Sequence, residues 1–467
     1  MIKGDFSDTI VALSTPAGIG AIGVIRLSGT KAVGIVNSIF KGKNLTEQAS
    51  HTIHLGKLID KNQIIDEVLV SLFLAPSSYT KENVVEISCH GSPYIQQKII
   101  EVLIKHGARP AKPGEFTQRA FLNGRFDLSQ AEAVADIIAS DSQAAHKIAL
   151  QQMRGGISSK LKELRTALVD FTALIELELD FGEEDVEFAD RTKLNELLHQ
   201  IQQEITILSN SFQLGNAIKN GIPVAIIGKP NAGKSTLLNA LLEEERAIVS
   251  DIAGTTRDTI EEAFTIDGFL FRFIDTAGLR EAKDEIEKIG VERSKEAIEK
   301  AEIIIYVSDY KEMKAEDVFA EVVKLNIHTR NIILVANKAE EIFEKEGGGI
   351  HYNNFIENLG FSNHLFISAK EKTGIDLLKK KLLAMVLNDK IDAQNAVIIT
   401  NQRHYDALQK SETAIAEVLE KIQQNISSDF ISQDIKTALF HLGTITGEID
   451  IDKDILATIF GKFCIGK

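Results

Sequence analysis

The segment Gly228–Ser235, Gly-Lys-Pro-Asn-Ala-Gly-Lys-Ser, constrains the fold more than any other part of this 467-residue chain. It follows a run typical of a buried strand, Pro223–Ile227, and precedes a helix-forming stretch, Thr236–Leu242. Glycines let the backbone N–H groups of such a loop turn inward around phosphates, and the following helix N-terminus favours anions. A chance match to this pattern is on the order of 1% at average residue usage. The sequence therefore predicts a phosphate-binding loop, in which Lys234 contacts the phosphates and Ser235 ligates Mg²⁺.

Later segments complete a nucleotide site in the order that GTPases use. Gly254–Asp258 contains Thr256, which can supply a second Mg²⁺ ligand and sense the γ-phosphate. Asp275–Gly278 follows a predicted strand, where its carboxylate can hold Mg²⁺ through water. Asn337–Glu340 and Ser368–Lys370 also follow predicted strands and resemble guanine-reading elements. Their order is more specific than any single segment, and it predicts a GTP-binding domain.

The first guanine-reading element departs from the usual pattern at its last position. GTPases normally have Asn-Lys-x-Asp, whereas this chain has Asn-Lys-Ala-Glu, ending at Glu340. The carboxylate is expected to accept hydrogen bonds from guanine N1–H and the exocyclic amine. Because Glu is one methylene longer, the loop must shift to keep both bonds short. We still expect guanine to be the base, with weaker discrimination.

Hydrophobic patterning on either side of this domain predicts two further domains. Residues 1–122 mix strand-type runs with one helix at Pro93–Lys105, which indicates an α+β domain. Residues 123–216 and 381–467 have helical patterns, and neither is a complete domain, so we expect one helical domain interrupted by a GTPase domain at 217–380. The fold class is therefore multidomain α/β and α, with a mostly parallel, Ras-like sheet in the inserted domain. The predicted strands are Thr9–Leu13, Ile22–Leu27, Ile64–Leu74, Val84–Ser88, Pro223–Ile227, Phe269–Ile274, Ile303–Val307, Ile332–Ala336 and Leu365–Ile367.

Two short segments of the helical part carry local signals. Ser129–Glu132 has the spacing of a capping box, which predicts a helix start at Ser129. The acidic run Glu176–Glu187 holds seven carboxylates, for which a solvated helix end is the default interpretation. A hinge or a partner-docking surface is the alternative for that run.

Net charge and cysteine content limit the possible binding partners and cellular location of the protein. The net charge of −15 argues against a broad polyanion-binding surface, so any nucleic-acid contact must use a local basic patch or a partner. The run Lys98–Arg125 is such a patch, although a solvated face is the simpler interpretation. Two cysteines cannot form a disulfide framework, which favours a reducing cytosol. The apolar run Ile10–Leu27 is broken by a proline and three glycines, so we expect neither a signal peptide nor a membrane segment, and a cytoplasmic protein.

Segments along the whole chain resemble the MnmE (TrmE) family, the GTPases of tRNA wobble-uridine modification. Outside the GTPase motifs they are Asp8–Ala12, Gly20–Gly29, Glu86–Gly91, Arg109–Asn123 and the terminal Phe463–Lys467. The resemblance therefore covers all three predicted domains.

The resemblance implies a potassium-dependent GTPase. Asn231, the carbonyls of Ser250 and Ile252, and Thr255 would ligate K⁺ beside the phosphates, where a cation can do what an arginine finger does elsewhere. The resemblance further implies that pairing of two GTPase domains orders the segment Ser250–Thr255.

A second implication concerns the attacking water. Leu279 stands where Ras-type enzymes have a water-orienting glutamine, and Glu287 aligns with the family's water-orienting glutamate. Glu287 also belongs to an acidic cluster that is equally typical of a solvated loop, so both interpretations stay open. The catalytic residues expected are Glu287, Lys234 and Cys464, and the Mg²⁺ ligands are Ser235 and Thr256. The nucleotide-binding residues expected are Asn231, Ala232, Gly233, Lys234, Ser235, Thr236, Ser250, Thr255, Thr256, Asp275, Thr276, Ala277, Gly278, Asn337, Lys338, Glu340, Ser368, Ala369 and Lys370.

At the two chain ends, the resemblance implies a folate-binding-like N-terminal domain that also dimerises the protein. Arg26, Glu86, Arg125 and Lys467 correspond to family positions that bind formyl-tetrahydrofolate, whose pterin edge suits a carboxylate and whose glutamate tail suits cations. Cys464 could act as a nucleophile in one-carbon transfer if its thiolate is stabilised. A lone cysteine is more often structural.

The resemblance also implies the tRNA modification reaction in which the protein takes part. A homodimer would join the flavoprotein MnmG (GidA) in a heterotetramer and add a carboxymethylaminomethyl or aminomethyl group to C5 of the tRNA wobble uridine. A methylene- or formyl-tetrahydrofolate would supply the carbon, and FAD would belong to the partner, because we expect no dinucleotide-binding Gly-x-Gly-x-x-Gly unit in this chain. Two alternatives stay open: a ribosome-assembly GTPase switch, and a GTP-driven dimer clamp without one-carbon chemistry.

Overall fold

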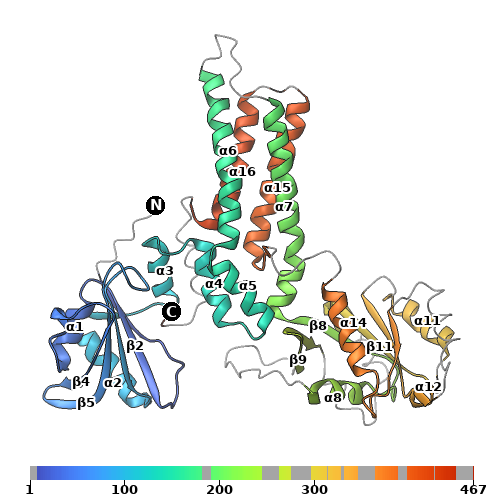
Figure 1. Ribbon diagram of the computed structural model, residues 1–467, viewed down its shortest axis with the longest axis horizontal. Helices are drawn as coiled ribbons and strands as arrows, with labels where there is room; N and C mark the ends of the chain where they lie inside the picture. Colours follow the sequence, from blue (N-terminus) through green and yellow to red (C-terminus); the bar gives the residue numbers. More distant parts are fainter. Residues whose placement is uncertain are drawn as a thin grey trace. The chain divides into compact units, whose positions relative to one another are not determined.

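The computed structural model describes most of the chain, which divides into two compact units (Figure 1). The described residues are 8–180, 191–244, 262–274, 296–312, 314–327, 331–344, 363–387, 397–424, 426, 428–448 and 466. The first unit comprises residues 1–135, 151–206 and 403–467, and the second comprises 136–150 and 207–402. No helix among these residues is both long enough and apolar enough to span a membrane.

A seven-stranded sheet forms the N-terminal part of the first unit. Its strand order is β3-β4-β5-β6-β2-β1-β7, and every neighbouring pair is antiparallel except β1 with β7. Helices α1 (Ala32–Ile39) and α2 (Pro93–Lys105) pack their apolar residues on one face and form a common core with it. The strands are β1 Thr9–Leu13, β2 Ile22–Ser28, β3 Phe40–Lys41, β4 Thr52–Asp60, β5 Gln63–Phe73, β6 Val84–His90 and β7 Ala108–Pro110.

On the opposite face of this sheet, the described residues leave the part formed by β4 and β5 open, whereas Phe116 packs with Ile10 and Ala12 of β1. Side chains alternate along β6, so that Val85, Ile87 and Cys89 are buried against the helices while Glu86 and Ser88 face the other way. Large apolar side chains, Ile53, Leu55 and Leu69 among them, are exposed.

The predicted N-terminal strands and helix are present, but β3, β4, β7, α1 and α3 (Glu115–Leu122) were not predicted. Gly18, Gly20 and Gly23 have the spacing Gly-x-Gly-x-x-Gly and follow strand β1. This segment leads into strand β2, whereas a dinucleotide-binding unit needs a helix N-terminus at this point for the pyrophosphate.

The first unit also contains long helices, which come from both sides of the GTPase sequence (Figure 1). Helix α6 (Gly156–Asp180) packs against α16 (Ser428–Thr446). Helix α7 (Arg191–Asn220) contacts α15 (Gln402–Gln423) where the Thr206 hydroxyl donates to Glu412 at 2.6 Å. Segments separated by the whole GTPase sequence therefore pack together, as an inserted domain requires.

Helix α4 (Leu128–Ile138) begins differently from the prediction. The Asp127 carboxylate accepts the N–H of Gln130 at 2.9 Å and therefore caps the helix, while Ser129 already lies inside it. Glu132, expected to complete a capping box, instead receives hydrogen bonds from Arg403 at 2.7 and 3.0 Å. The capping-box prediction was wrong because a distant cation competes for the same carboxylate.

A six-stranded sheet is the centre of the second unit. Its order is β13-β12-β11-β8-β10-β9, and only the β9–β10 pair is antiparallel, which confirms the mostly parallel sheet. Strand β9, which precedes β10, was not predicted. The strands are β8 Ile222–Ile227, β9 Glu262–Ile266, β10 Phe269–Phe273, β11 Ile303–Asp309, β12 Ile332–Asn337 and β13 His364–Phe366, with helices α8 Lys234–Glu244, α11 Ala315–Lys324, α12 Glu340–Glu344 and α14 Ile375–Leu387.

The start of helix α5 (Gln143–Met153) also belongs to this unit. The N–H of Ala144 donates to the carbonyl of Gly268, in the β9–β10 turn, at 3.0 Å. Together with the fold of the first unit, these elements confirm the predicted fold class. The domain limits at 122, 216 and 380 stay predictions.

Candidate functional sites

The loop between β8 and α8 is shaped by backbone conformations that few residue types adopt. Gly228, Asn231 and Gly233 have φ angles of 143°, 62° and 93°. A Cβ at Gly228 would lie 2.0 Å from the carbonyl oxygen of Val307, and one at Gly233 would lie 2.2 Å from the side-chain nitrogen of Asn337. Glycine is therefore required at both positions, and the strand–loop–helix context of the motif is confirmed.

The ammonium group of Lys234 is held within this loop. Its Nζ donates to the carbonyls of Gly228 and Lys229, both at 2.8 Å, and burial lowers the pKa of the ammonium. Ser235 and Thr236 follow in the first turn of α8, beside the N–H groups that the helix leaves without intrahelical partners. The arrangement brings a cation and backbone donors to one place, as phosphate binding requires.

Asn337 connects the phosphate loop with both guanine-reading segments. Its side-chain N–H donates to the carbonyl of Ala232 at 2.8 Å, and its side-chain oxygen accepts the N–H of Ala369 at 3.0 Å. The side chain is buried, so both hydrogen bonds are protected from water. Three predicted segments are thus parts of one connected site.

Glu340 is already placed to act as an ionised acceptor. The Ser368 hydroxyl donates to its Oε1 at 2.8 Å, and the Lys311 ammonium lies 3.5 Å from its Oε2. The hydrogen bond from Ser368 is the main cause that lowers the pKa of the carboxyl, with a smaller contribution from Lys311. The extra methylene is therefore used to reach Ser368, whereas the last predicted residue, Lys370, is exposed.

Two residues of this site, Asp309 and Lys311, were not predicted. They lie at and just beyond the carboxyl end of β11, and Asp309 pairs with the Lys338 ammonium at 2.6 Å. Burial, the largest single cause, raises the pKa of the Asp309 carboxyl. The hydrogen bond and charge of Lys338, together with the backbone N–H groups of Lys311 and Glu312, outweigh it, so the pKa is lowered. Their position at the end of a predicted strand could have indicated them, because ligands of parallel α/β sheets bind at the carboxyl ends of strands.

Several predicted site residues lie outside the described residues. They are Ser250, Ile252, Thr255, Thr256, Asp275, Thr276, Ala277, Gly278, Glu287, Cys464 and Lys467. Of the predicted metal ligands, the structure therefore describes Ser235 for Mg²⁺ and Asn231 for K⁺.

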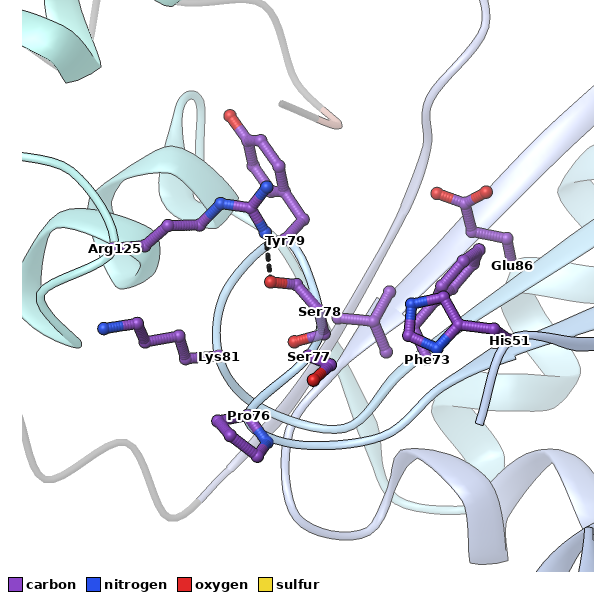
Figure 2. A pocket seen from close by; sticks show the side chains of 10 residues that line it. His51, Phe73, Pro76, Ser77, Ser78, Tyr79, Lys81, Glu86 and Arg125 are labelled. Carbon is purple, nitrogen blue, oxygen red and sulfur yellow. Dashed lines mark hydrogen bonds between the residues drawn. The ribbon is translucent and has the colours of Figure 1, made fainter. Parts of the chain in front are cut away.

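A second site is a cavity of about 550 Å³ in the first unit (Figure 2). The loop between β5 and β6 forms one side of it, and two of the predicted folate-binding residues, Glu86 and Arg125, line it. The complete lining is His51, Phe73, Pro76, Ser77, Ser78, Tyr79, Lys81, Val84, Glu86 and Arg125.

The third predicted folate residue of the described part, Arg26, supports this cavity through Glu86. The two residues are cross-strand neighbours on β2 and β6. Arg26 contacts Oε1 of Glu86 with Nε at 2.8 Å and with Nη2 at 2.7 Å. Both side chains are about three-quarters buried, which strengthens the pair relative to a surface ion pair.

Arg125 is held in a different way. Its guanidinium donates to the carbonyl of Ser78, and its Cζ lies 5.3 Å from the ring centroid of Tyr79 and 5.2 Å from that of Phe126. Within the described ranges, no carboxylate forms an ion pair with Arg125. Among the described residues, the Arg125 guanidinium therefore lines the cavity without an ion-pair partner.

The end of the chain reaches the same sheet. The carbonyl of Gly466 accepts a hydrogen bond from the Ser14 hydroxyl at 3.1 Å. Gly466 has a φ of 99°, and a Cβ there would lie 2.1 Å from the carbonyl oxygen of Leu13. Leu13 is the register partner of Ile25, the residue before Arg26.

Three cations of the basic run Lys98–Arg125 form ion pairs with carboxylates of the same domain. Lys98 pairs with Asp60 at 3.0 Å, and Arg109 pairs with Glu115 at 2.6 Å. Arg119 is fully buried and contacts the carboxylates of Asp8, Glu82 and Glu115. These groups support the structural interpretation of the run over a polyanion-binding one.

A glycine-built phosphate loop, a buried asparagine that joins it to the two predicted guanine-reading segments, and a mostly parallel sheet define a P-loop GTPase. Two family descriptions match the chain: "MnmE helical domain" over residues 128–464 and "GTP-binding protein TrmE N-terminus" over residues 9–125. The chain belongs to the MnmE family of tRNA modification GTPases, and it is a GTP hydrolase.

Relatives match over nearly the whole length. The tRNA modification GTPase MnmE of Cytophaga hutchinsonii is 52% identical, over 99% of this chain and 98% of the relative. That of Flavobacterium johnsoniae is 54% identical, over 98% and 99%. Among solved structures, Aquifex aeolicus Era bound to GDP·AlF₄⁻ matches 41% of this chain and 66% of its own at 26% identity, with a TM-score of 0.27 that is too low to support an argument.

Proposed function

We propose that this GTPase works with the flavoprotein MnmG to add a carboxymethylaminomethyl or aminomethyl group to C5 of the wobble uridine of tRNA. One observation carries the proposal: besides the nucleotide site, the chain has a cavity that gathers Glu86 and Arg125, with Arg26 behind Glu86. A carboxylate, a guanidinium and aromatic walls suit a reduced folate, which combines a donor-rich pterin edge with a glutamate tail. A tetrahydrofolate derivative bound there would supply the transferred carbon.

The nucleotide site fits GTP. The phosphate loop leaves no room for a Cβ at Gly228 and Gly233, and Glu340 offers an ionised acceptor for guanine. Ser235 and Thr256 would hold Mg²⁺, and Asn231, with Ser250, Ile252 and Thr255, would hold K⁺. The monovalent ion would supply positive charge beside the phosphates, and Glu287 would orient the attacking water.

The proposed assembly follows from charge and from the open sheet face. A net charge of −15 makes it reasonable that the partner supplies basic tRNA-binding surface as well as FAD. A second copy of the chain would cover the exposed Ile53, Leu55 and Leu69 and form the homodimer. The setting proposed is the cytoplasm.

The decisive experiment measures wobble-uridine nucleosides in tRNA hydrolysates from cells that depend on this protein. Cys464→Ser is expected to abolish the modified nucleoside. Cys89→Ser is the matched control, because Cys89 is buried, its Sγ contacts the carbonyl of Gly23, and burial raises the pKa of its thiol to about 11. Normal modification with Cys464→Ser would reject the thiol as a nucleophile, and would favour a clamp that leaves the chemistry to its partner.

The potassium assignment has its own test. GTP turnover by the purified full-length protein is compared in K⁺ and Na⁺ at matched ionic strength. We expect turnover to be at least tenfold faster in K⁺, since removing a transition-state electrostatic group typically costs more than that. Equal rates would reject the potassium site while leaving the GTPase assignment in place.

A further inference from the structure

Tyr79 is a cavity residue that no motif singles out. It lies in the loop between β5 and β6, and its ring forms part of the cavity wall (Figure 2). Its hydroxyl is 2.8 Å from the Oγ1 of Thr117, a buried residue of helix α3 (Glu115–Leu122). Burial raises the pKa of the phenol, so the side chain is neutral. Tyr79 is therefore a fixed, uncharged aromatic surface.

Both guanidinium groups of this region lie against that ring. The Cζ of Arg26 and the Cζ of Arg125 are each 5.3 Å from the Tyr79 centroid, within the range of cation–π attraction. A second ring flanks each cation, with Phe116 at 5.8 Å from Arg26 and Phe126 at 5.2 Å from Arg125. Tyr79 is the ring that the two cations share.

The two cations differ in what else holds them. Arg26 is fixed by its ion pair with Glu86 at 2.7 Å. The guanidinium of Arg125 contacts only the Ser78 carbonyl and the aromatic rings among the described residues, and Figure 2 shows it beside the Tyr79 ring. Removing the ring should therefore free Arg125 more than Arg26, because a carboxylate still fixes Arg26.

We propose that Tyr79 is a positioning residue of the reduced-folate site. Its ring pre-orders Arg125 to meet a ligand carboxylate, and it supports Arg26, which orients Glu86 toward the donor edge of the ligand ring. Ordering a long side chain in advance lowers the entropy cost of binding, which makes the effect measurable. The inference rests on the proposed function, because it names how that site is built.

The test is calorimetric titration of the full-length protein with 5-formyl-tetrahydrofolate. We expect Tyr79→Leu to weaken binding about tenfold, within the range of cation–π contributions at partly buried sites. Tyr79→Phe keeps the ring and should stay within about threefold of wild type. Tyr94→Leu is the matched control and should have no effect, because Tyr94 lies on α2 with 75% of its surface exposed.

A double-mutant cycle separates positioning from general damage. In the Arg125→Gln background, Tyr79→Leu should weaken binding less than threefold, because the cation that the ring orders is already gone. Full additivity of the two changes would overturn the proposal, and so would wild-type affinity in Tyr79→Leu. An equal loss in Tyr79→Phe would assign the effect to the Thr117 hydrogen bond and would also overturn it.

An isosteric change covers the case in which Tyr79→Leu fails to fold. Tyr79→pentafluorophenylalanine keeps the ring shape while reversing its quadrupole, so it should bind about tenfold more weakly than Tyr79→Phe. Equal affinities of these two variants would reject the proposal. If the wild type does not bind the folate at all, the proposed function fails together with it; if the wild type binds and the ring variants do too, only this inference fails.

Discussion

The nucleotide loop and the N-terminal cavity are built in opposite ways. The loop is defined by backbone: Gly228 and Gly233 adopt positive φ angles where a Cβ would collide with neighbouring atoms. The cavity is defined by side chains such as Glu86 and Arg125, which come from a strand and from a loop after α3. The residues of a backbone-defined site are consecutive in the sequence, whereas those of a side-chain site come from distant segments. The two sites should therefore respond separately to mutation.

The largest expected effect tests that independence from the nucleotide side. Glu287→Ala should lower kcat for GTP by about 10²–10⁴-fold, the usual range for a group that orients or deprotonates a nucleophile. GTP affinity and 5-formyl-tetrahydrofolate affinity should remain unchanged. Steady-state turnover, nucleotide titration and folate titration of the same preparation check the three quantities.

The outcome separates two interpretations of the acidic cluster around Glu287. Glu281→Ala is the control, because Glu281 is another carboxylate of the same acidic segment. A normal kcat in Glu287→Ala would end the assignment of the water-orienting role. An equal loss in both variants would point to the charge of the loop instead of one residue.

The converse test acts on the cavity. Glu86→Gln keeps the shape of the side chain but removes the charge that pairs with Arg26 at 2.7 Å. Hydrogen bonds to charged groups contribute about 1.5–3 kcal/mol, so folate affinity should fall by about 10–100-fold. GTP turnover in K⁺ should not change. Glu67→Gln, at an exposed position of β5, is the matched control for charge loss on the same sheet.

The same contrast explains which parts of the fold the sequence predicted. Strands β8, β10, β11, β12 and β13 were predicted to within about two residues, because buried parallel strands form continuous apolar runs. Strand β4 was not predicted, since Gly56 and Lys57 interrupt its alternation. Its place in the sheet depends on pairing with β5.

The site residues differ in the same way, because some belong to local motifs and others have only distant partners. Asn337 and Ser368 were predicted from short motifs, and the structure joins them to Ala232 and Glu340. Tyr79 had no local signal, because its significance comes from two arginines that approach from separate segments. Long-range partners of this kind cannot be read from spacing.

A smaller effect concerns Glu340, the carboxylate that we propose binds guanine. Ser368→Ala removes the 2.8 Å hydrogen bond to Glu340, and a net loss of about 1 kcal/mol should weaken GTP binding about fivefold. The bond holds the pKa of Glu340 below its usual value, so its loss should raise that pKa.

The pH dependence of this variant follows from the sign of the shift. Guanine needs the ionised carboxylate, so GTP affinity is present above the pKa of Glu340 and is lost as the pH falls through it. In Ser368→Ala this loss should begin at a higher pH than in the wild type. Lys311→Ala should move it less, because the ammonium is half exposed and lies 3.5 Å away. If GTP affinity is lost at the same pH in Ser368→Ala and in the wild type, Glu340 does not contact the base.

The smallest expected effect tests whether the chain terminus belongs to the cavity system. Ser14→Ala removes the hydrogen bond to the carbonyl of Gly466, two residues after Cys464. A partly buried neutral hydrogen bond of this length lies at the lower end of the usual range, about 0.5 kcal/mol, so wobble-uridine modification should slow by about two- to threefold, with no change in K⁺-stimulated GTP turnover. Ser14→Thr keeps the hydroxyl and should retain the rate. A loss of GTP turnover in Ser14→Ala would contradict the separation of the two sites. An unchanged modification rate would instead show that other contacts fix the terminus, because a tether that sets the position of a reacting group cannot be removed without cost to the rate.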